Sequence, residues 1–427
     1  SVKIKILINS QIIIDYADEN NQILNGKIGL EVVPGGYQPN PQGLTTSTLY
    51  DNIVVSELLN SSLPVPLLKQ TDPLWKDLEY DSAHLWSLFP TIERWGCALT
   101  SASMVLQYYH HNIFPDALNT WLNGQPDGYL GNGLLNWLAI SRYTKQHESI
   151  DSPSLEYKRY TANTNILNSE ISNSRPAILN VPGHFVVGTG IDSSDFFIND
   201  PAFSKTKLSQ YPSFTGIHSY IPSQTDLSYI LLLGNPELNI SVYDNQNNSV
   251  GEFYIQNPLT DDQDESSNSG NPKKIFLLPK PLNGEYKIIL QDDISSNYNL
   301  ESYLYNINGD VTKTVIPGLI SPNESEEFTL HFNSQNGSNI VKKVTLASLK
   351  DDLNTAWLNG FINKKPVYEL IKKAIDKADT FLKKGKTKQY MLALELIKKE
   401  VEVYTPRFIS SDASGVLVND INGLLNP

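Results

Sequence analysis

The sequence predicts a multidomain fold in which an α+β core is flanked by β-sandwich modules and followed by a three-helix bundle. The first observation is the length of 427 residues, which exceeds one ordinary hydrophobic core and is typical of two to four domains. The second is the order of signals in the middle of the chain, where a helical pattern precedes several strand patterns. The third is the helical periodicity that follows a region of short strands near the C-terminal end.

Composition and charge exclude several classes of protein. The formal net charge is -13 and the pI is about 5.0, so no basic face is expected for nucleic acid or anionic lipid. A mean hydropathy of -0.29 is normal for a soluble globular chain. No apolar run approaches the roughly 18 residues that a membrane span needs. Cys97 is the only cysteine, so intramolecular disulfides are excluded.

Residues 1–66 are predicted to form β-strands. Strand patterns lie at 2–8, 11–14, 26–33 and 50–55. The last two resemble the closing strands of a laminin-G or concanavalin-like sandwich, and a generic β appendage is the alternative. Because the chain begins at Ser1 with neither a methionine nor a signal peptide, we expect it to be part of a longer secreted precursor.

Residues 67–233 carry the α+β pattern. A helix is expected over 97–109, where Ala98, Ala102, Val105 and Tyr109 share one face. Strands are expected at 176–181, 184–188 and 196–199.

Residues 235–347 predict a β-sandwich, with strands at 238–243, 284–290 and 327–332. The acidic stretch 261–270 is interpreted as a solvated loop. Calcium binding there is a minor alternative, because the stretch lacks the ligand spacing of an EF-hand.

Residues 349–427 are predicted to form a bundle of three helices. The first begins at Pro366, the second contains Tyr390 and Val401, and the third contains Ala413 and Leu424. On the first helix we place Val367, Leu370, Ile371, Ala374 and Ala378 on the buried side. The segment 357–378 resembles the FIMAH module, a helical C-terminal module of secreted bacterial proteins.

Cys97 is the first candidate for chemistry. Gly96 is expected to let the backbone turn sharply, so that the sulfur lies at a helix N-terminus. Such a site lowers the pKa of a cysteine from about 8.5 towards roughly 3.5–7.5, especially beside a histidine. The alternative is an inert buried cysteine.

His184 and Asp200 supply a matching acid–base pair. His184 opens one predicted strand and Asp200 closes the next, with Asp192 midway in the turn. We therefore expect the two side chains to face each other across an antiparallel ladder, where the carboxylate orients the imidazole. The other histidines, His84, His110, His111, His147, His218 and His331, are interpreted as surface or structural.

Four motifs in order carry a resemblance to a known family. They are LLKQTDPLW, RWGCALTSASMVLQYY, RPAILNVPGHFVVGTG and FFINDPAF, within residues 67–220. This pattern resembles the bacteriocin-leader-peptidase-like branch of papain-like cysteine peptidases. The resemblance implies that Cys97 is the nucleophile, His184 its base and Asp200 the orienting acid. It also implies that Gln70 forms an oxyanion hole with the Cys97 backbone N–H, and an insertion around 81–90 would explain the long separation of these two residues.

The expected function is that of an extracytoplasmic cysteine peptidase with accessory modules. Its substrate would be a peptide or protein, its modules would contact a glycan or a bacterial cell surface, and no cofactor or metal is predicted. The alternative is an inactive peptidase fold that serves as a scaffold in a structural or adhesive surface protein. A third interpretation is a transferase that resolves the acyl-enzyme with an amine.

Overall fold

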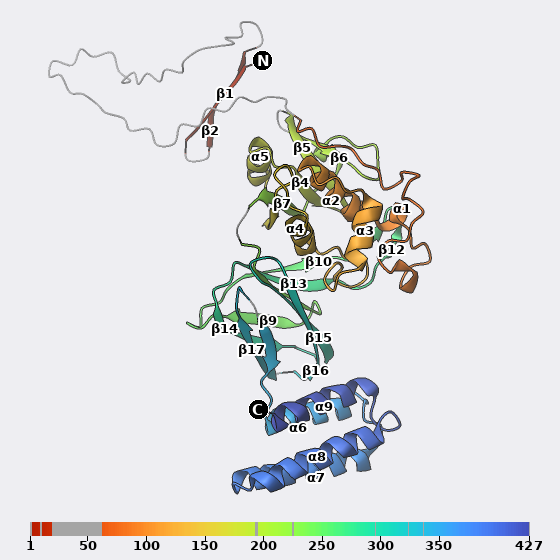
Figure 1. Ribbon diagram of the computed structural model, residues 1–427, viewed down its shortest axis with the longest axis vertical. Coiled ribbons are helices and arrows are strands. Elements are labelled where there is room, and N and C mark those ends of the chain that lie inside the picture. The colour runs from red at the N-terminus through yellow and green to blue at the C-terminus, as the bar shows by residue number, and fades with distance from the viewer. Residues whose placement is uncertain are drawn as a thin grey trace, which may run out of the picture.

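The computed structural model describes residues 2–8, 11–18, 62–192, 195–223, 226–294, 296–322, 324–335 and 337–426 (Figure 1). At the N-terminus, β1 (Val2–Ile8) and β2 (Gln11–Asp18) pair as an antiparallel hairpin, where strands were predicted. The predicted strands at 26–33 and 50–55 lie outside the described residues, and the concanavalin-like assignment rests on them.

An α/β unit occupies the upper part of Figure 1. Its helices are α1 (Ile92–Trp95), α2 (Cys97–Tyr108), α3 (Pro115–Asn123), α4 (Trp137–Gln146) and α5 (Thr164–Ser172), with the short 3-10 turns η1 (Ala83–Leu85) and η2 (Leu208–Gln210). Its antiparallel sheet has the order β3-β7-β4-β5-β6. The strands are β3 (Leu155–Thr161), β4 (Ala177–Val181), β5 (His184–Asp192), β6 (Asp195–Asn199) and β7 (Gly216–Pro222). Helices therefore precede most of the sheet, as the sequence predicted.

The sheet of this unit is buried on both faces by helices. Ile178 and Phe185 share a core with α2, whereas their neighbours Leu179 and Val186 share a second core with α5. Successive residues of a strand point to opposite faces, so strands covered on both sides are apolar throughout. This explains the continuous apolar runs of β4 and β5, and it holds the start of α2 close to the start of β5.

Two further antiparallel sheets pack face to face below the α/β unit (Figure 1). The first has the order β10-β13-β8-β15-β16 and the second the order β18-β17-β14-β9. Their strands are β8 (Tyr229–Gly234), β9 (Asn239–Tyr243), β10 (Glu252–Gln256), β13 (Lys273–Pro279), β14 (Gly284–Gln291), β15 (Ser296–Tyr305), β16 (Val311–Ile320), β17 (Ser325–Phe332) and β18 (Asn339–Lys342). A small hairpin of β11 (Thr260–Asp261) and β12 (Asp264–Asn268) projects from the first sheet towards the α/β unit.

The strand β8 corrects the predicted boundary between residues 233 and 235. It pairs with β13 and β15, so the two-sheet unit begins before Tyr229. Ile230 and Leu232 face the second sheet, whereas Leu231 and Leu233 pack into the core shared with the α/β unit. Because both faces of β8 are buried, the strand lacks the polar alternation that marks an outer strand of a sandwich.

Within the described residues 337–426, four helices are present where three were predicted. They are α6 (Leu346–Leu358), α7 (Lys365–Lys383), α8 (Thr387–Tyr404) and α9 (Ser411–Leu425). The missed helix α6 buries Leu349 and Leu353, but Asp352 also faces inward and interrupts the apolar pattern. Leu370, which we placed on the buried side of α7, is 42% exposed. Among the described residues, no helix is both long enough and apolar enough to cross a membrane.

A buried lysine joins the sheets to these helices. The Lys342 ammonium lies 2.8 Å from Glu326, 3.0 Å from Asp352 and 3.2 Å from Asp420. The four side chains are between 3% and 8% exposed, so their charges are shielded from water. One cation thus holds carboxylates from β17, α6 and α9 together.

Candidate active site

Cys97 is the first residue of α2 and follows directly on α1 and Gly96. A Cβ atom on Gly96 would lie 2.5 Å from the Ile92 carbonyl oxygen, a distance that real Cβ atoms do not show. The φ angle of Gly96 is -83°, so any residue could adopt its backbone conformation. Glycine is therefore required here because this residue lies close to the Ile92 carbonyl of the preceding turn, and not for the sharp turn that we predicted.

Replacing Gly96 by alanine is expected to reduce the free energy of unfolding by about 1–3 kcal/mol, because the added methyl group overlaps the Ile92 carbonyl. Urea unfolding measures this change. The matched control is Gly415→Ala in α9, where a Cβ atom would meet nothing within 4 Å. That control should stabilise the helix by about 0.5–1 kcal/mol. A Gly96→Ala protein as stable as the wild type would contradict the steric argument.

His184 and Asp200 lie together at the open end of the β5–β6 hairpin. The His184 Nε2 atom is 3.0 Å from Asp200 Oδ1. The register pairs Val187 with Asn199, so His184 would face position 202 rather than 200. Our predicted register was thus displaced by two residues, which keeps a side chain on the same face of a strand. The predicted contact between the two side chains is confirmed.

Several donors hold the Asp200 carboxylate in place. The Tyr211 hydroxyl donates to Oδ2 at 2.5 Å, and the backbone N–H groups of Ala202 and Phe203 donate to Oδ1 at 3.0 and 2.9 Å. Burial alone would raise the pKa of Asp200, but the hydrogen bonds from His184 and Tyr211 lower it below its usual value. Asp200 is thus an anion that orients the imidazole.

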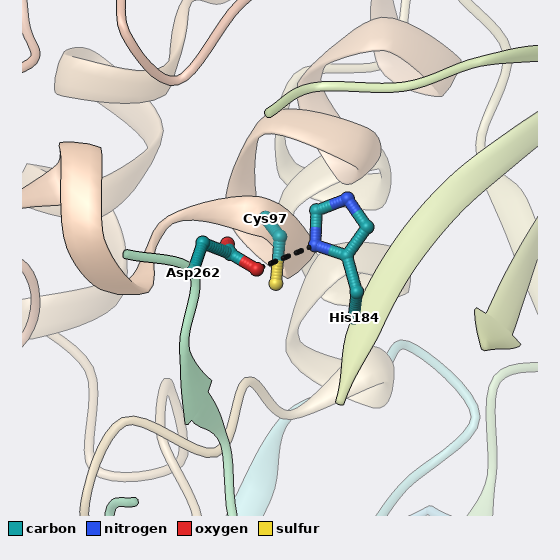
Figure 2. Close-up of side chains that lie close together, drawn as sticks. All are labelled: Cys97, His184 and Asp262. Atoms are coloured by element: carbon teal, nitrogen blue, oxygen red, sulfur yellow. Dashed lines mark ion pairs between the residues drawn. The ribbon is translucent and has the colours of Figure 1, made fainter. Parts of the chain in front are cut away.

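The other nitrogen of His184 faces Asp262 and the cysteine (Figure 2). Nδ1 lies 2.9 Å from Asp262 Oδ1, as an ion-pair contact that is not aligned with the N–H direction. The Cys97 sulfur, a His184 nitrogen and an Asp262 oxygen all lie within 4.8 Å of one another. The imidazole is therefore placed between Asp200 on one side and the thiol with Asp262 on the other.

Gln70 is fully buried beside these residues. Its Nε2 atom donates to the Glu93 carbonyl at 2.6 Å and to Asp262 Oδ2 at 2.9 Å. Its backbone N–H donates to the Pro201 carbonyl at 3.0 Å, which fixes Gln70 next to Asp200. The predicted insertion at 81–90 forms a loop that contains η1 and returns to the chain through a bridge between Glu79 and Thr91. The long separation therefore does not prevent Gln70 from reaching the site.

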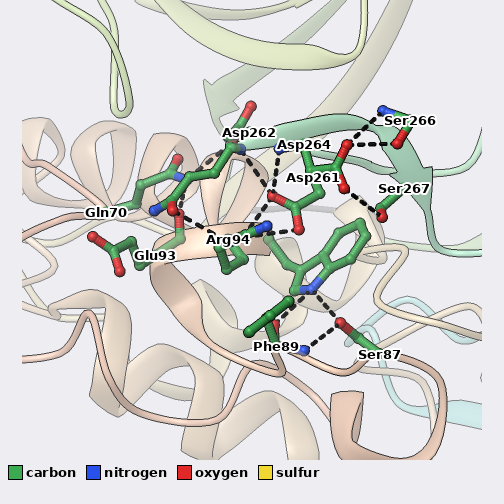
Figure 3. A network of polar contacts seen from close by, with 12 residues as sticks. Gln70, Ser87, Phe89, Glu93, Arg94, Asp261, Asp262, Asp264, Ser266 and Ser267 are labelled. Carbon is green, nitrogen blue, oxygen red and sulfur yellow. Dashed lines mark hydrogen bonds and ion pairs between the residues drawn. The ribbon is translucent and has the colours of Figure 1, made fainter.

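Asp262 is the site residue that sequence reasoning missed. We interpreted 261–270 as a solvated loop, but the Asp261 and Asp262 side chains are only 2% and 5% exposed. They lie at the tip of the β11–β12 hairpin, which enters the site from the neighbouring sheet unit (Figure 3). The acidic run was visible in the sequence, but nothing local to it indicates which distant surface it contacts.

The pKa of Cys97 is shifted in the direction opposite to the one that we predicted for a thiolate. Burial and the nearby Asp262 charge raise the pKa of Cys97, although His184 acts in the opposite direction. Burial alone would lower the pKa of His184, but its contacts with Asp200 and Asp262 raise it well above the usual value. In this arrangement the imidazole is protonated and paired with two carboxylates, while the sulfur keeps its proton.

The cluster of Cys97, His184 and Asp262 contains donor types that bind zinc. Zinc–ligand bonds of about 2.0–2.2 Å place two tetrahedral ligands roughly 3.3 Å apart. The nitrogen and oxygen here are 2.9 Å apart, which is the distance of a direct ion pair. The geometry fits a charge contact between the two side chains better than an intervening metal ion.

Comparisons with known proteins agree with this picture. Residues 62–225 match the model of the Peptidase_C39 like family. The match covers the α/β unit with Gln70, Cys97, His184 and Asp200, and it supports a papain-like cysteine peptidase relationship for that segment. Searches of the curated proteins and of the solved structures found no match.

Proposed function

We propose that the chain is a cysteine peptidase in which Cys97 attacks a peptide bond, His184 transfers the proton, Asp200 orients the imidazole and Gln70 stabilises the oxyanion. One observation carries the proposal: the His184 ring has Asp200 on Nε2 and both Asp262 and the helix-terminal sulfur on its other side. A nucleophile next to a base, with an orienting acid on the far side of the base, is the arrangement of an activated thiol. The family match of the same segment is the second support.

The acylation step follows from this geometry. Acylation starts from neutral His184, so the imidazolium that is paired with Asp262 first releases its Nδ1 proton to solvent. The Cys97 proton then moves to His184 Nδ1, and the thiolate forms a C–S bond with the substrate carbonyl carbon. The imidazolium then donates its proton to the amine nitrogen as the C–N bond breaks. Asp200 keeps Nε2–H directed away from the substrate throughout, so that Nδ1 alone exchanges the proton.

Deacylation reverses these roles with water. His184 removes a proton from a water molecule, the hydroxide attacks the thioester, and the thiolate leaves to regenerate the enzyme. In both steps negative charge develops on the carbonyl oxygen. Gln70 Nε2 already donates to an anionic oxygen at this place, since it binds Asp262 Oδ2 at 2.9 Å. This contact supports Gln70 as an oxyanion donor together with the Cys97 backbone N–H.

The setting of the enzyme is part of the proposal. A peptide or protein substrate fits the chemistry, and the remaining units would serve as accessory modules for a glycan or a bacterial surface. An extracellular or surface location is supported by the sequence resemblance of the C-terminal helices to a module of secreted bacterial proteins.

The scaffold alternative draws on a specific observation. Cys97 is 1% exposed and its thiol pKa is raised, which are properties of an inert cysteine. However, packing alone does not explain why His184 lies between the buried carboxylates of Asp200 and Asp262. The alternative predicts that removing Asp262 leaves the protein inactive.

A peptide library tests the proposed function. Two proteins are incubated with a library of unstructured peptides: the wild type and the Asp262→Ala variant, in which His184 Nδ1 and Gln70 Nε2 lose their contacts with this carboxylate. New peptide termini are identified by mass spectrometry. We expect new peptide termini with at least one of these proteins, and none after Cys97 is replaced by alanine in the same protein. If none of the proteins produces new termini, the scaffold interpretation holds.

Replacing Gln70 by alanine should lower kcat by about 10²–10³-fold with little change in KM, because the lost donor acts on the developing oxyanion. The control is Gln107→Ala, near the C-terminal end of α2, where the amide donates to the Ile113 carbonyl. An equal loss of kcat in the two variants would indicate a general effect on packing and not an oxyanion hole.

A further inference from the structure

We propose that the β11–β12 hairpin is an autoinhibitory plug, with the Asp262 carboxylate standing in the place of the substrate carbonyl between Cys97, His184 and Gln70. The proposal rests on the proposed function and adds a regulatory state to it. The hairpin belongs to the two-sheet unit, whereas the site belongs to the α/β unit, so one unit of the chain closes the active site of the other.

The contacts of Asp262 are those that a substrate would need. Its Oδ2 atom accepts from Gln70 Nε2 at 2.9 Å, and its Oδ1 atom lies 2.9 Å from His184 Nδ1 (Figures 2 and 3). The first contact is the proposed oxyanion donor and the second is the proton donor to the leaving group. A substrate carbonyl cannot reach either group while the carboxylate is present, because the same atoms are occupied.

Asp262 also competes with the thiolate for the charge on the imidazole. The active form of a Cys–His pair is a thiolate next to an imidazolium, which stabilise each other. Here the imidazolium has carboxylates near both nitrogens, and a thiolate would be a third anion in a buried site. Like charges at this distance disfavour ionisation of the thiol. The plug therefore blocks the substrate and also keeps the nucleophile in its unreactive form.

Arg94 clamps the tip of the hairpin to the site. Its Nε atom lies 2.7 and 2.8 Å from the two Asp261 oxygens, and its Nη1 donates to Gln263 Oε1 at 3.1 Å (Figure 3). The Asp262 N–H donates to the Arg94 carbonyl at 3.1 Å. Since Arg94 lies three residues before the nucleophile, the clamp fixes the plug to α1, directly before the helix that begins at Cys97.

Hydrogen bonds within the hairpin hold the turn that carries Asp262. Asp261 Oδ1 accepts from the backbone N–H groups of Gln263 and Asp264 at 2.8 and 3.1 Å, which forms the tight turn that presents Asp262. At the base, Leu259 is buried in the core shared by the two units and is paired with Ser269 through two hydrogen bonds. The rim residues Gln263, Asp264 and Ser266 are exposed. The tip can therefore leave the site without unfolding either sheet.

The decrease in kcat/KM that the plug causes depends on the fraction of molecules in which the hairpin occupies the site. If the closed form outnumbers the open form about 100-fold, the apparent kcat/KM falls about 100-fold, because only the open form binds substrate. Removing the carboxylate or the clamp shifts this ratio. We therefore expect alkylation and cleavage to increase by about 10–100-fold in variants that release the hairpin.

Iodoacetamide alkylation of Cys97 tests the plug without requiring peptidase activity, because Cys97 is the only thiol in the chain. The variants are Asp262→Ala, which removes the plug, and Arg94→Gln, which removes the clamp but does not touch the sulfur. The matched control is Asp264→Asn, an exposed carboxylate on the same hairpin. Hydrogen exchange of residues 259–269 reports whether the hairpin leaves the site.

We expect faster alkylation in both release variants, faster exchange of the hairpin in Arg94→Gln, and wild-type values in the control. Alkylation at the wild-type rate in both release variants would overturn the plug. Loss of peptide cleavage in Asp262→Ala would also overturn it, since Asp262 would then be a catalytic partner. Faster alkylation with no cleavage of any peptide would instead support the plug and refute the proposed peptidase function.

Discussion

Replacing Cys97 by alanine is expected to abolish peptide cleavage, with a loss of about 10⁴-fold or more in kcat/KM. The sulfur is the atom that forms the covalent bond with the substrate in the proposed mechanism, and alanine provides no nucleophile in its place. The measurement is best made in the Asp262→Ala background, where the site is open. In that background the decrease in kcat/KM measures the lost chemical step, because the hairpin no longer blocks the site.

The fold should survive this substitution. The Cys97 side chain is small and 1% exposed, and alanine retains its Cβ atom at the helix N-terminus. Circular dichroism and the thermal midpoint serve as controls. Retained cleavage by a correctly folded Cys97→Ala protein would show that another group is the nucleophile.

Replacing Lys342 by methionine is expected to reduce the free energy of unfolding by about 3–5 kcal/mol, because it leaves three buried carboxylates without a cation. Burial alone would lower the pKa of Lys342, but Asp352, Glu326 and Asp420 raise it above its usual value. The lysine is thus charged in the folded protein at neutral pH. The control is Lys343→Met, whose exposed ion pair with Glu327 is worth less than about 1 kcal/mol.

The Lys342 variant should also depend on pH in a defined direction. Burial raises the pKa of Asp352 and of Glu326 above their usual values. A carboxyl group with a raised pKa in the folded state favours folding when it is protonated, and this contribution is lost as the pH rises through that value. The deficit of Lys342→Met relative to the wild type should therefore shrink from pH 7.5 to pH 5. Urea unfolding followed by helical circular dichroism measures it, and a deficit that grows on acidification would contradict the assignment.

Cys97, His184 and Asp200 were accessible from sequence because each lies in a local pattern, whereas Gln70 was assigned only through the family resemblance. Cys97 opens an apolar helix after glycine, and His184 and Asp200 bracket two short strands. The register was wrong because the prediction centred the hairpin on Asp192, whereas Asp192 pairs with Asp195, and the displacement is two residues beyond the shift between Gly188 and Gly190. The alternation of apolar residues does not show where the turn between two strands is centred.

Asp262 could not be found in this way. It lies 192 residues after Gln70 and belongs to another unit, so its position depends on how two folded units pack. The same limit explains β8, whose apolar run fits a strand of either unit until its partners are known. Helix α6 was missed because the inward-facing Asp352 interrupts its row of apolar residues. The buried charge is balanced by Lys342, which lies on a strand outside the helix.

Active-site labelling can show whether Cys97 and His184 act as a catalytic pair. A peptidyl acyloxymethyl ketone reacts with a thiolate that has an imidazolium partner, and the adduct can be located by mass spectrometry. We expect a single adduct on Cys97 in the Asp262→Ala protein, and labelling at least about 10²-fold slower when His184 is also replaced by alanine. Labelling of Cys97 at equal rates with and without His184 would contradict a catalytic Cys–His pair.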